Sequence, residues 1–307
     1  MTPRLADFIG ASARSMKRSW YALMVLFGGV SYGVVSPLVK TAFARGFGPG
    51  TVAVGQFYYA AALLWALVAL TGGGVRFSRA DGWRLAVLGA LGAVASIAYY
   101  RSLHDLPVWL GVILLFQFAW ITPVIDFLAT RRRLRRAKWA GVAIILAGTI
   151  LAAGAESGAA VRVTPVGVLL GLASGVSYAV FLYISGTVQE PRRPFARAAV
   201  ITTVSLVVSW TLYPPTPHVL APVIRGALSV GAVGLFSQVL PITLFSLGIP
   251  RVGGAAAAIL GSVELPVAVV AAAVLLGETV SWRSWTGVIL ILAGIVVSEW
   301  RPQGDVG

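Results

Sequence analysis

Residues 139–148 read Trp-Ala-Gly-Val-Ala-Ile-Ile-Leu-Ala-Gly. The stretch returns at residues 285–294 as Trp-Thr-Gly-Val-Ile-Leu-Ile-Leu-Ala-Gly, with seven identities at an offset of 285 − 139 = 146 residues. A second match has the same offset, because Gly-Val-Ser-Tyr occurs at residues 29–32 and again at residues 175–178. Two matches in register are hard to obtain from composition alone. The sequence therefore predicts one unit of about 146 residues used twice.

The composition indicates an integral membrane protein. Hydrophobic residues make up 58% of the chain, charged residues 11%, and the mean hydropathy is +0.88. A soluble domain needs about a quarter of its residues charged to cover its surface. We therefore expect lipid to cover most of this one.

The net charge of +14 has two readings. On a soluble protein it would suggest nucleic acid, but here the basic residues lie in short loops, where they orient a membrane protein. We expect the lipid bilayer as the partner and no nucleic acid. The chain has no cysteine and only two distant histidines, His104 and His218, so we expect no metal site. A phosphate-binding loop is absent, so we expect no ATP-driven chemistry, no cofactor and no enzyme.

Ten apolar runs are long enough to cross a bilayer as helices, which need about 20 residues each. They are residues 19–39, 49–70, 83–103, 107–129, 137–154, 165–186, 195–213, 223–248, 253–276 and 284–300. The predicted fold is all-α and integral to the membrane, with ten transmembrane helices in two five-helix repeats. The first repeat spans residues 19–155 and the second residues 165–300; residues 1–18 and 301–307 are tails.

The lysines and arginines predict the orientation. The side of the membrane that holds both tails carries 18 of them, and the opposite side carries 6. Basic residues favour the cytoplasm, so both termini are expected there, in a multi-pass protein of the inner membrane. Residues 1–18 are polar and basic, and we expect no cleaved signal. Because each unit has an odd number of spans, the second repeat must be inverted relative to the first.

Inverted repeats are the usual build of secondary transporters, with the substrate bound near mid-membrane between the halves. We therefore expect a secondary active transporter that works by alternating access. The alternative is a polytopic scaffold or sensor that binds a small ligand without moving it. Monomer and homodimer are both compatible with the sequence.

Several motifs resemble the EamA branch of the drug/metabolite transporter superfamily. They are Tyr32-Gly33 followed by Lys40, then Glu264-Leu265-Pro266, Leu276-Gly277-Glu278 and the stretch from Gly287 to Gly294. The first half departs from this pattern, since Arg131 and Arg132 stand where Gly-Glu is expected. The resemblance implies a cavity lined by spans one to four and six to nine. It also implies export of small metabolites or drugs, coupled to protons or to exchange of solutes.

Glu264 is the main candidate for chemistry. It lies near the middle of the ninth predicted span, where a carboxylate costs several kcal/mol unless it is neutral, paired or wetted. It could exchange a proton for substrate, or it could be a protonated group that bonds a neighbouring helix at the Pro266 break. Both readings stay open.

Other candidates for substrate binding are polar or aromatic residues inside the predicted cavity spans, which suit a small organic ligand. They are Gln117, Trp120, Gln238, Tyr32, Tyr178 and Tyr99. Small residues predict close helix packing. These are Gly167, Gly171 and Gly175 in the sixth span, with Gly29 and Gly33 in the first.

Overall fold

A computed structural model describes residues 19–72, 77–131, 136–153, 163–187, 194–252 and 260–299. Most of this part of the chain is helical and it contains no strand, which confirms the all-α class. After a first helix over residues 19–33, the helices are α2 (Val35–Ala44), α3 (Pro49–Thr71), α4 (Arg79–Asp105), α5 (Val108–Leu115), α6 (Phe118–Thr130), α7 (Arg136–Ala153), α8 (Pro165–Thr187), α9 (Pro194–Leu212), α10 (Pro217–Arg225), α11 (Ala227–Gly234), the π-helical turn η1 (Leu235–Val239), α12 (Leu240–Val252), α14 (Glu264–Leu276) and α15 (Trp282–Glu299).

Seven helical stretches within these ranges are long and apolar enough to cross a membrane. They are Ser19–Ala44, Pro49–Thr71, Arg79–Asp105, Val108–Thr130, Pro165–Ser185, Pro194–Leu212 and Ala227–Phe245. Two shorter apolar helices, Glu264–Leu276 and Trp282–Ser298, follow. The two-repeat fold is thus built from membrane helices, while the count of ten transmembrane helices stays a prediction.

The outer surface of the helices is apolar. Leu70 is 83% exposed and Leu228 is 87% exposed, and large side chains such as Phe27, Ile150 and Val274 also face outward. A soluble monomer rarely exposes so much apolar surface. These side chains suit contact with lipid.

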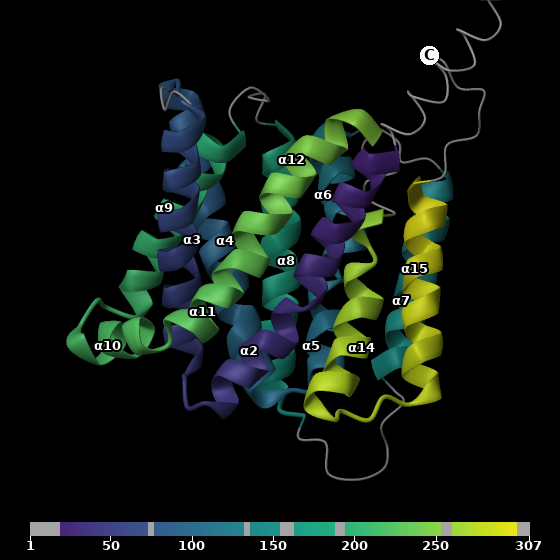
Figure 1. Cartoon of the computed structure of the whole chain (residues 1–307). Helices are drawn as coiled ribbons and strands as arrows, with labels where there is room; N and C mark the ends of the chain where they lie inside the picture. Colours follow the sequence, from purple (N-terminus) through teal and green to yellow (C-terminus); the bar gives the residue numbers. More distant parts are fainter. Residues whose placement is uncertain are drawn as a thin grey trace, which may run out of the picture.

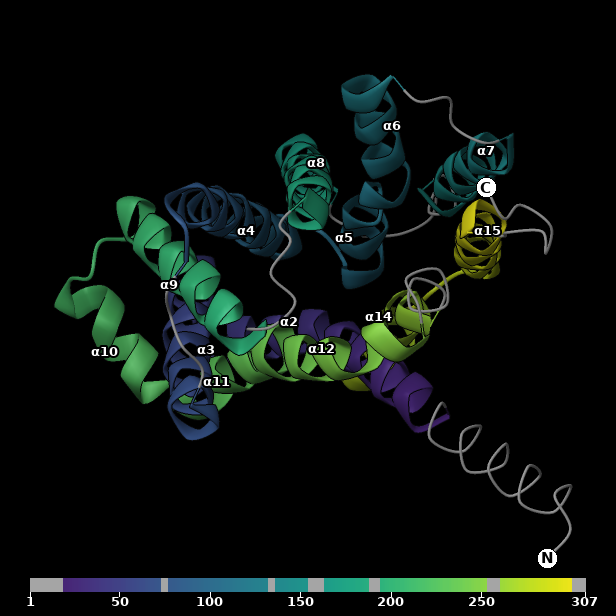
Figure 2. The ribbon, with the colours of Figure 1, turned by 90° about the horizontal axis from the view of Figure 1, so that it is seen from above.

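The stretch at residues 139–148 packs against its own copy. It lies in α7, its copy lies in α15, and the two helices stand side by side at one end of the molecule (Figures 1 and 2). A Cβ on Gly141 would lie 2.6 Å from the carbonyl oxygen of Gly294, and one on Gly148 would lie 2.7 Å from that of Gly287. The two equivalent helices therefore run antiparallel, with each end of one facing the opposite end of the other.

A second pair of symmetry-related contacts involves the first helix and α8. A Cβ on Gly29 would lie 2.7 Å from the carbonyl oxygen of Gly261, and one on Gly175 would lie 3.0 Å from that of Leu115. Each member of the first pair is 146 residues from a member of the second: 175 − 29 = 146 and 261 − 115 = 146. Each half therefore packs its first helix against the other half's broken helix.

Both halves break a helix at the same place. Between α5 and α6, the backbone amide of Gln117 donates to the carbonyl oxygen of Leu114 at 3.3 Å. Before α14, the backbone amide of Val263 donates to the carbonyl oxygen of Leu260 at 3.4 Å. These bonds span three residues rather than four, which tightens the turn and redirects the chain. As a result, α6 starts at Phe118 and α14 starts at Glu264, again 146 residues apart.

The remaining helices pack around α4. It contacts α8 and α9, while α9 also contacts α3, and α3 contacts α11. In the view from above, α10 lies at the end of the molecule opposite α7 and α15 (Figure 2). The cavity described below lies among α3, α4, α8, α9 and α12.

Candidate functional site

A cavity of about 490 Å³ opens between the two halves. Its walls come from the first helix, α2, α3, α4 and α5 of the first half, and from α8, α9, η1, α12 and α14 of the second. The volume lies in the range of small-molecule sites, about 300–1,000 Å³. Both repeats therefore contribute to one site of ligand size.

Five of the residues singled out from the sequence line this cavity. They are Tyr32, Tyr99, Tyr178, Gln238 and Glu264. The Tyr99 hydroxyl shares a hydrogen bond of 2.7 Å with Ser36, and the Tyr32 ring lies 6.0 Å from that of Phe245. The tertiary fold thus brings together residues that are up to 232 positions apart (264 − 32).

Gln117 and Trp120 do not line the cavity. The Gln117 amide nitrogen donates to the carbonyl of Ile113 at 2.8 Å and to the hydroxyl of Thr149 at 3.0 Å, and its oxygen accepts from the Trp120 indole at 2.8 Å. These bonds use the polar groups to hold the α5–α6 break against α7. In the structure both side chains pack at the α5–α6 break, and the ligand contact expected from the sequence stays a prediction.

The glycines of α8 face α4 and α5. A Cβ on Gly171 would lie 2.8 Å from Leu114 and 3.0 Å from the Ser102 hydroxyl, and one on Gly167 would lie 2.9 Å from Leu106. In the first helix, a Cβ on Gly33 would lie 2.9 Å from the Glu264 carbonyl oxygen. Glycine at these positions allows the helix backbones to approach more closely than any larger residue would permit.

Glu264 is the first residue of α14, directly after the helix break. It is partly accessible from the cavity and interacts electrostatically with Tyr32, Tyr99 and Tyr178. Its counterpart in the first half is Phe118, whose ring packs edge-on against Tyr178 with centroids 4.9 Å apart. The pseudo-symmetric site therefore carries a carboxylate in one half and an aromatic ring in the other.

Gln56 forms a polar centre that the sequence did not single out above the other polar residues. It is fully buried, and its oxygen accepts from the Tyr100 hydroxyl and, at 2.8 Å, from the Ser237 hydroxyl. Ser237 lies in η1, where the helix is locally widened, a feature common at functional sites. No feature of the sequence predicts the π-helical turn, which only the structure shows. In the structure, the Gln56 amide nitrogen has no partner among the residues described.

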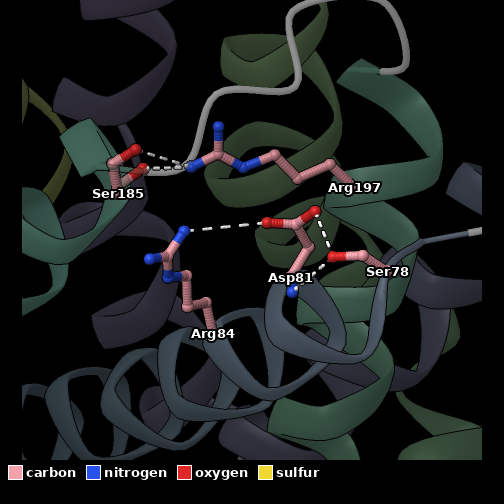
Figure 3. Close-up of polar contacts among 5 residues, drawn as sticks. All are labelled: Ser78, Asp81, Arg84, Ser185 and Arg197. Atoms are coloured by element: carbon pink, nitrogen blue, oxygen red, sulfur yellow. Dashed lines mark hydrogen bonds and ion pairs between the residues drawn. The ribbon is translucent and has the colours of Figure 1, made fainter.

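In the sequence, Arg197 counted only as one of the 18 basic residues that predict the orientation, and the structure places it on the cavity wall in the first turns of α9. Its guanidinium donates to the Ser185 carbonyl at 3.0 Å and to the Ser185 hydroxyl at 2.6 Å (Figure 3). The charge rule predicts that this end of the bundle faces the cytoplasm. The cavity therefore reaches from Glu264 toward the end that holds Arg197.

At the opposite end of the bundle, Glu278 contacts the first residue of α5. Its two carboxylate oxygens each accept from the amide of Val108, at 3.0 Å, where α5 begins. A carboxylate is stabilised there by the free amide groups and the positive end of the helix dipole. Lys40 lies within electrostatic range of Glu278 and Asp105. The Leu-Gly-Glu motif thus joins the second half to the first on the side away from Arg197.

Comparison with known proteins agrees with this architecture. The model of the EamA-like transporter family matches residues 19–154 and residues 165–300, one match for each repeat. A solved structure titled "Crystal structure of protein" superposes with a TM-score of 0.61, covering 91% of this chain and 96% of that one at 19% identity, which supports the fold alone.

A curated relative from Bacillus subtilis (strain 168), "Uncharacterized transporter YwfM", is 27% identical over 193 residues. The match covers 60% of this chain and 61% of that protein. The two matches of the family model, together with the paired repeats and apolar helices, identify the molecule: the chain belongs to the EamA-like transporter family, within the drug/metabolite transporter superfamily, and is a multi-pass membrane protein.

Proposed function

We propose that the protein is a secondary active transporter that exports small organic solutes across the inner membrane by alternating access through the cavity. The observation that carries this proposal is the position of Glu264. It is the one acidic side chain among the described cavity residues, and it lies at a helix break between the two repeats. Broken helices at a repeat interface are where secondary transporters bind substrates and coupling ions.

The two ends of the cavity supply the two access states. In this proposal, the end that holds Arg197 is the open one and the end where Glu278 contacts the start of α5 is the closed one. A shift of one repeat against the other would break the Glu278 contact and close the Arg197 end. The glycine contacts between the first helix and the residues around Gly261, and between α8 and α5, are the surfaces along which such a shift would occur.

We propose Glu264 as the coupling residue. A carboxylate within the bilayer is costly when charged, so it alternates readily between a protonated state and a hydrated, charged state. Both termini would lie in the cytoplasm, and the solute would leave through the side that Glu278 closes.

The test uses purified protein in proteoliposomes. Glu264→Gln keeps the size and most of the hydrogen bonding but fixes the neutral form. We expect transport driven by a pH gradient to be lost and exchange of solute for solute to persist. The matched control is Asp126→Asn, an exposed carboxylate at the end of α6, which should transport normally.

Wild-type gradient-driven flux in the Glu264→Gln protein would remove Glu264 from the coupling mechanism. Saturable counterflow by the wild-type protein separates a transporter from a sensor or scaffold, because only a transporter carries labelled solute inward against unlabelled solute. Binding without counterflow would favour the sensor.

A further inference from the structure

Arg197 carries a positive charge that the mechanism above leaves unused. Its Nη2 atom donates to two neutral oxygens of Ser185 and, within the ranges that the structure describes, it pairs with no carboxylate. The nearby Arg84 differs, since it forms an ion pair of 3.8 Å with Asp81 and does not line the cavity (Figure 3). Guanidinium has five N–H donors in a planar fork that fits a carboxylate. Arg197 therefore retains both charge and donors for a ligand.

Gln56 and Ser174 also belong to the wall of this cavity, but they lie beneath its surface. The Gln56 amide nitrogen and the Ser174 hydroxyl have no hydrogen-bond partner among the described residues, and the Gln56 oxygen accepts two hydrogen bonds. Both atoms are fully buried, so the polar group of a ligand is assigned to Arg197 and not to them.

Between these polar groups the walls are aromatic and apolar. Tyr178 and Phe181 stack with centroids 5.8 Å apart and an interplanar angle of 12°, and both line the cavity. Phe57 and Phe245 add two further rings. Such walls bind a flat or apolar body by burial and ring contact.

From these contacts we infer that the cavity is selective for small organic acids, with Arg197 as the residue that binds the anionic group and the aromatic walls holding the apolar body. The inference rests on the proposed function for the location of the site, and adds the substrate class. An amine would be repelled by Arg197, and the protonated, neutral form of Glu264 would not compensate that repulsion. A neutral amide would lose the charge-assisted hydrogen bond but keep the other contacts.

Binding to the full-length protein in lipid nanodiscs tests the inference without requiring transport. The probes are matched in shape: phenylacetate, phenylacetamide and phenethylamine, with the corresponding phenylpropionate and indoleacetate series. We expect the acids to bind about ten- to a hundredfold more tightly than their amides, the factor for a hydrogen bond to a charged group. The amines should bind more weakly than both.

Arg197→Gln should reduce the acid-to-amide ratio to near one while amide binding is kept, and Arg197→Lys should restore part of the ratio because the charge returns. Arg84→Gln is the control and should leave the ratio unchanged. Glu190 lies outside the described residues, so Glu190→Gln is measured too and should not strengthen acid binding.

Several results would overturn the inference: no acid in the three series binds more tightly than its amide, the ratio survives in Arg197→Gln, or Glu190→Gln raises acid affinity by the factor that Arg197→Gln removes. Failure of the proposed function has a different signature, namely normal acid selectivity in nanodiscs with no counterflow in proteoliposomes.

Discussion

The contact between α7 and α15 can be tested by adding one methyl group. In Gly141→Ala, the new Cβ would lie 2.6 Å from the carbonyl oxygen of Gly294 and 2.6 Å from the Ser298 Cβ. Ordinary contact begins at about 3.4 Å, so the helices must separate by about 0.8 Å. The nearest atoms belong to backbone and to a Cβ, which cannot rotate away. We expect a loss of about 1–3 kcal/mol in the free energy of unfolding, as for other overpacked interiors.

The mirror-image contact gives a second measurement. A Cβ on Gly294 would lie 2.7 Å from Ile145 and 2.8 Å from the Gly141 carbonyl oxygen, so Gly294→Ala should cost a similar amount. Because the first methyl already separates the helices, the second should cost less in its presence. The double variant should therefore lose less stability than the two single losses combined, which is coupling between residues in contact.

The assay is equilibrium unfolding in mixed micelles, followed by tryptophan fluorescence. Gly82→Ala is the control, since it lies in α4 and a Cβ there meets nothing within 4 Å. It should be neutral or gain up to about 1 kcal/mol from helix propensity. If Gly141→Ala behaves like this control, or if the double variant is strictly additive, α7 and α15 do not pack through the repeated glycines.

Three further predictions address the topology, the glycines of α8 and the closed end. With no native cysteine in the chain, a cysteine at the exposed Thr279 should react with an impermeant maleimide in intact cells and one at Arg136 should not; reversed labelling would refute the orientation. Gly171→Leu should impair folding or flux because its Cβ meets α5 at 2.8 Å, whereas Val166→Leu, 60% exposed, should be tolerated; equal tolerance would make the glycine incidental. Glu278→Ala should lower the free energy of unfolding by about 1–3 kcal/mol, because the Val108 amide at the start of α5 loses its acceptor. An unchanged melting temperature would argue against the contact.

Much of the candidate site was within reach of sequence reasoning. Glu264 stood out because a carboxylate within an apolar run has few structural explanations. Tyr32, Tyr99, Tyr178 and Gln238 were also named, and all line the cavity. Residue type and depth in the membrane are both readable from one sequence, and together they select such residues.

Gln117 shows where that reasoning stops. Its type and depth resemble those of Gln238, but the break between α5 and α6 turns it toward Thr149 and Trp120, where its hydrogen bonds are used. Which way a polar side chain points around a broken helix depends on the local turn, and the turn depends on packing. Arg197 shows the converse, because a residue that was counted only for its charge lies on the cavity wall.

Two properties of this chain were determined by its sequence alone: its class and its internal repeat. Both depend on features summed along the chain, namely apolar run length, charge balance and the 146-residue offset, and such sums are insensitive to small errors in any element. The tertiary structure alone decided that residues 139–148 face their own copy, that Glu264 and the charge of Arg197 share one cavity, and that Glu278 contacts the start of α5 at the other end. These are pairings between residues far apart in the chain, and they follow from side-chain volume and hydrogen-bond geometry where helices meet.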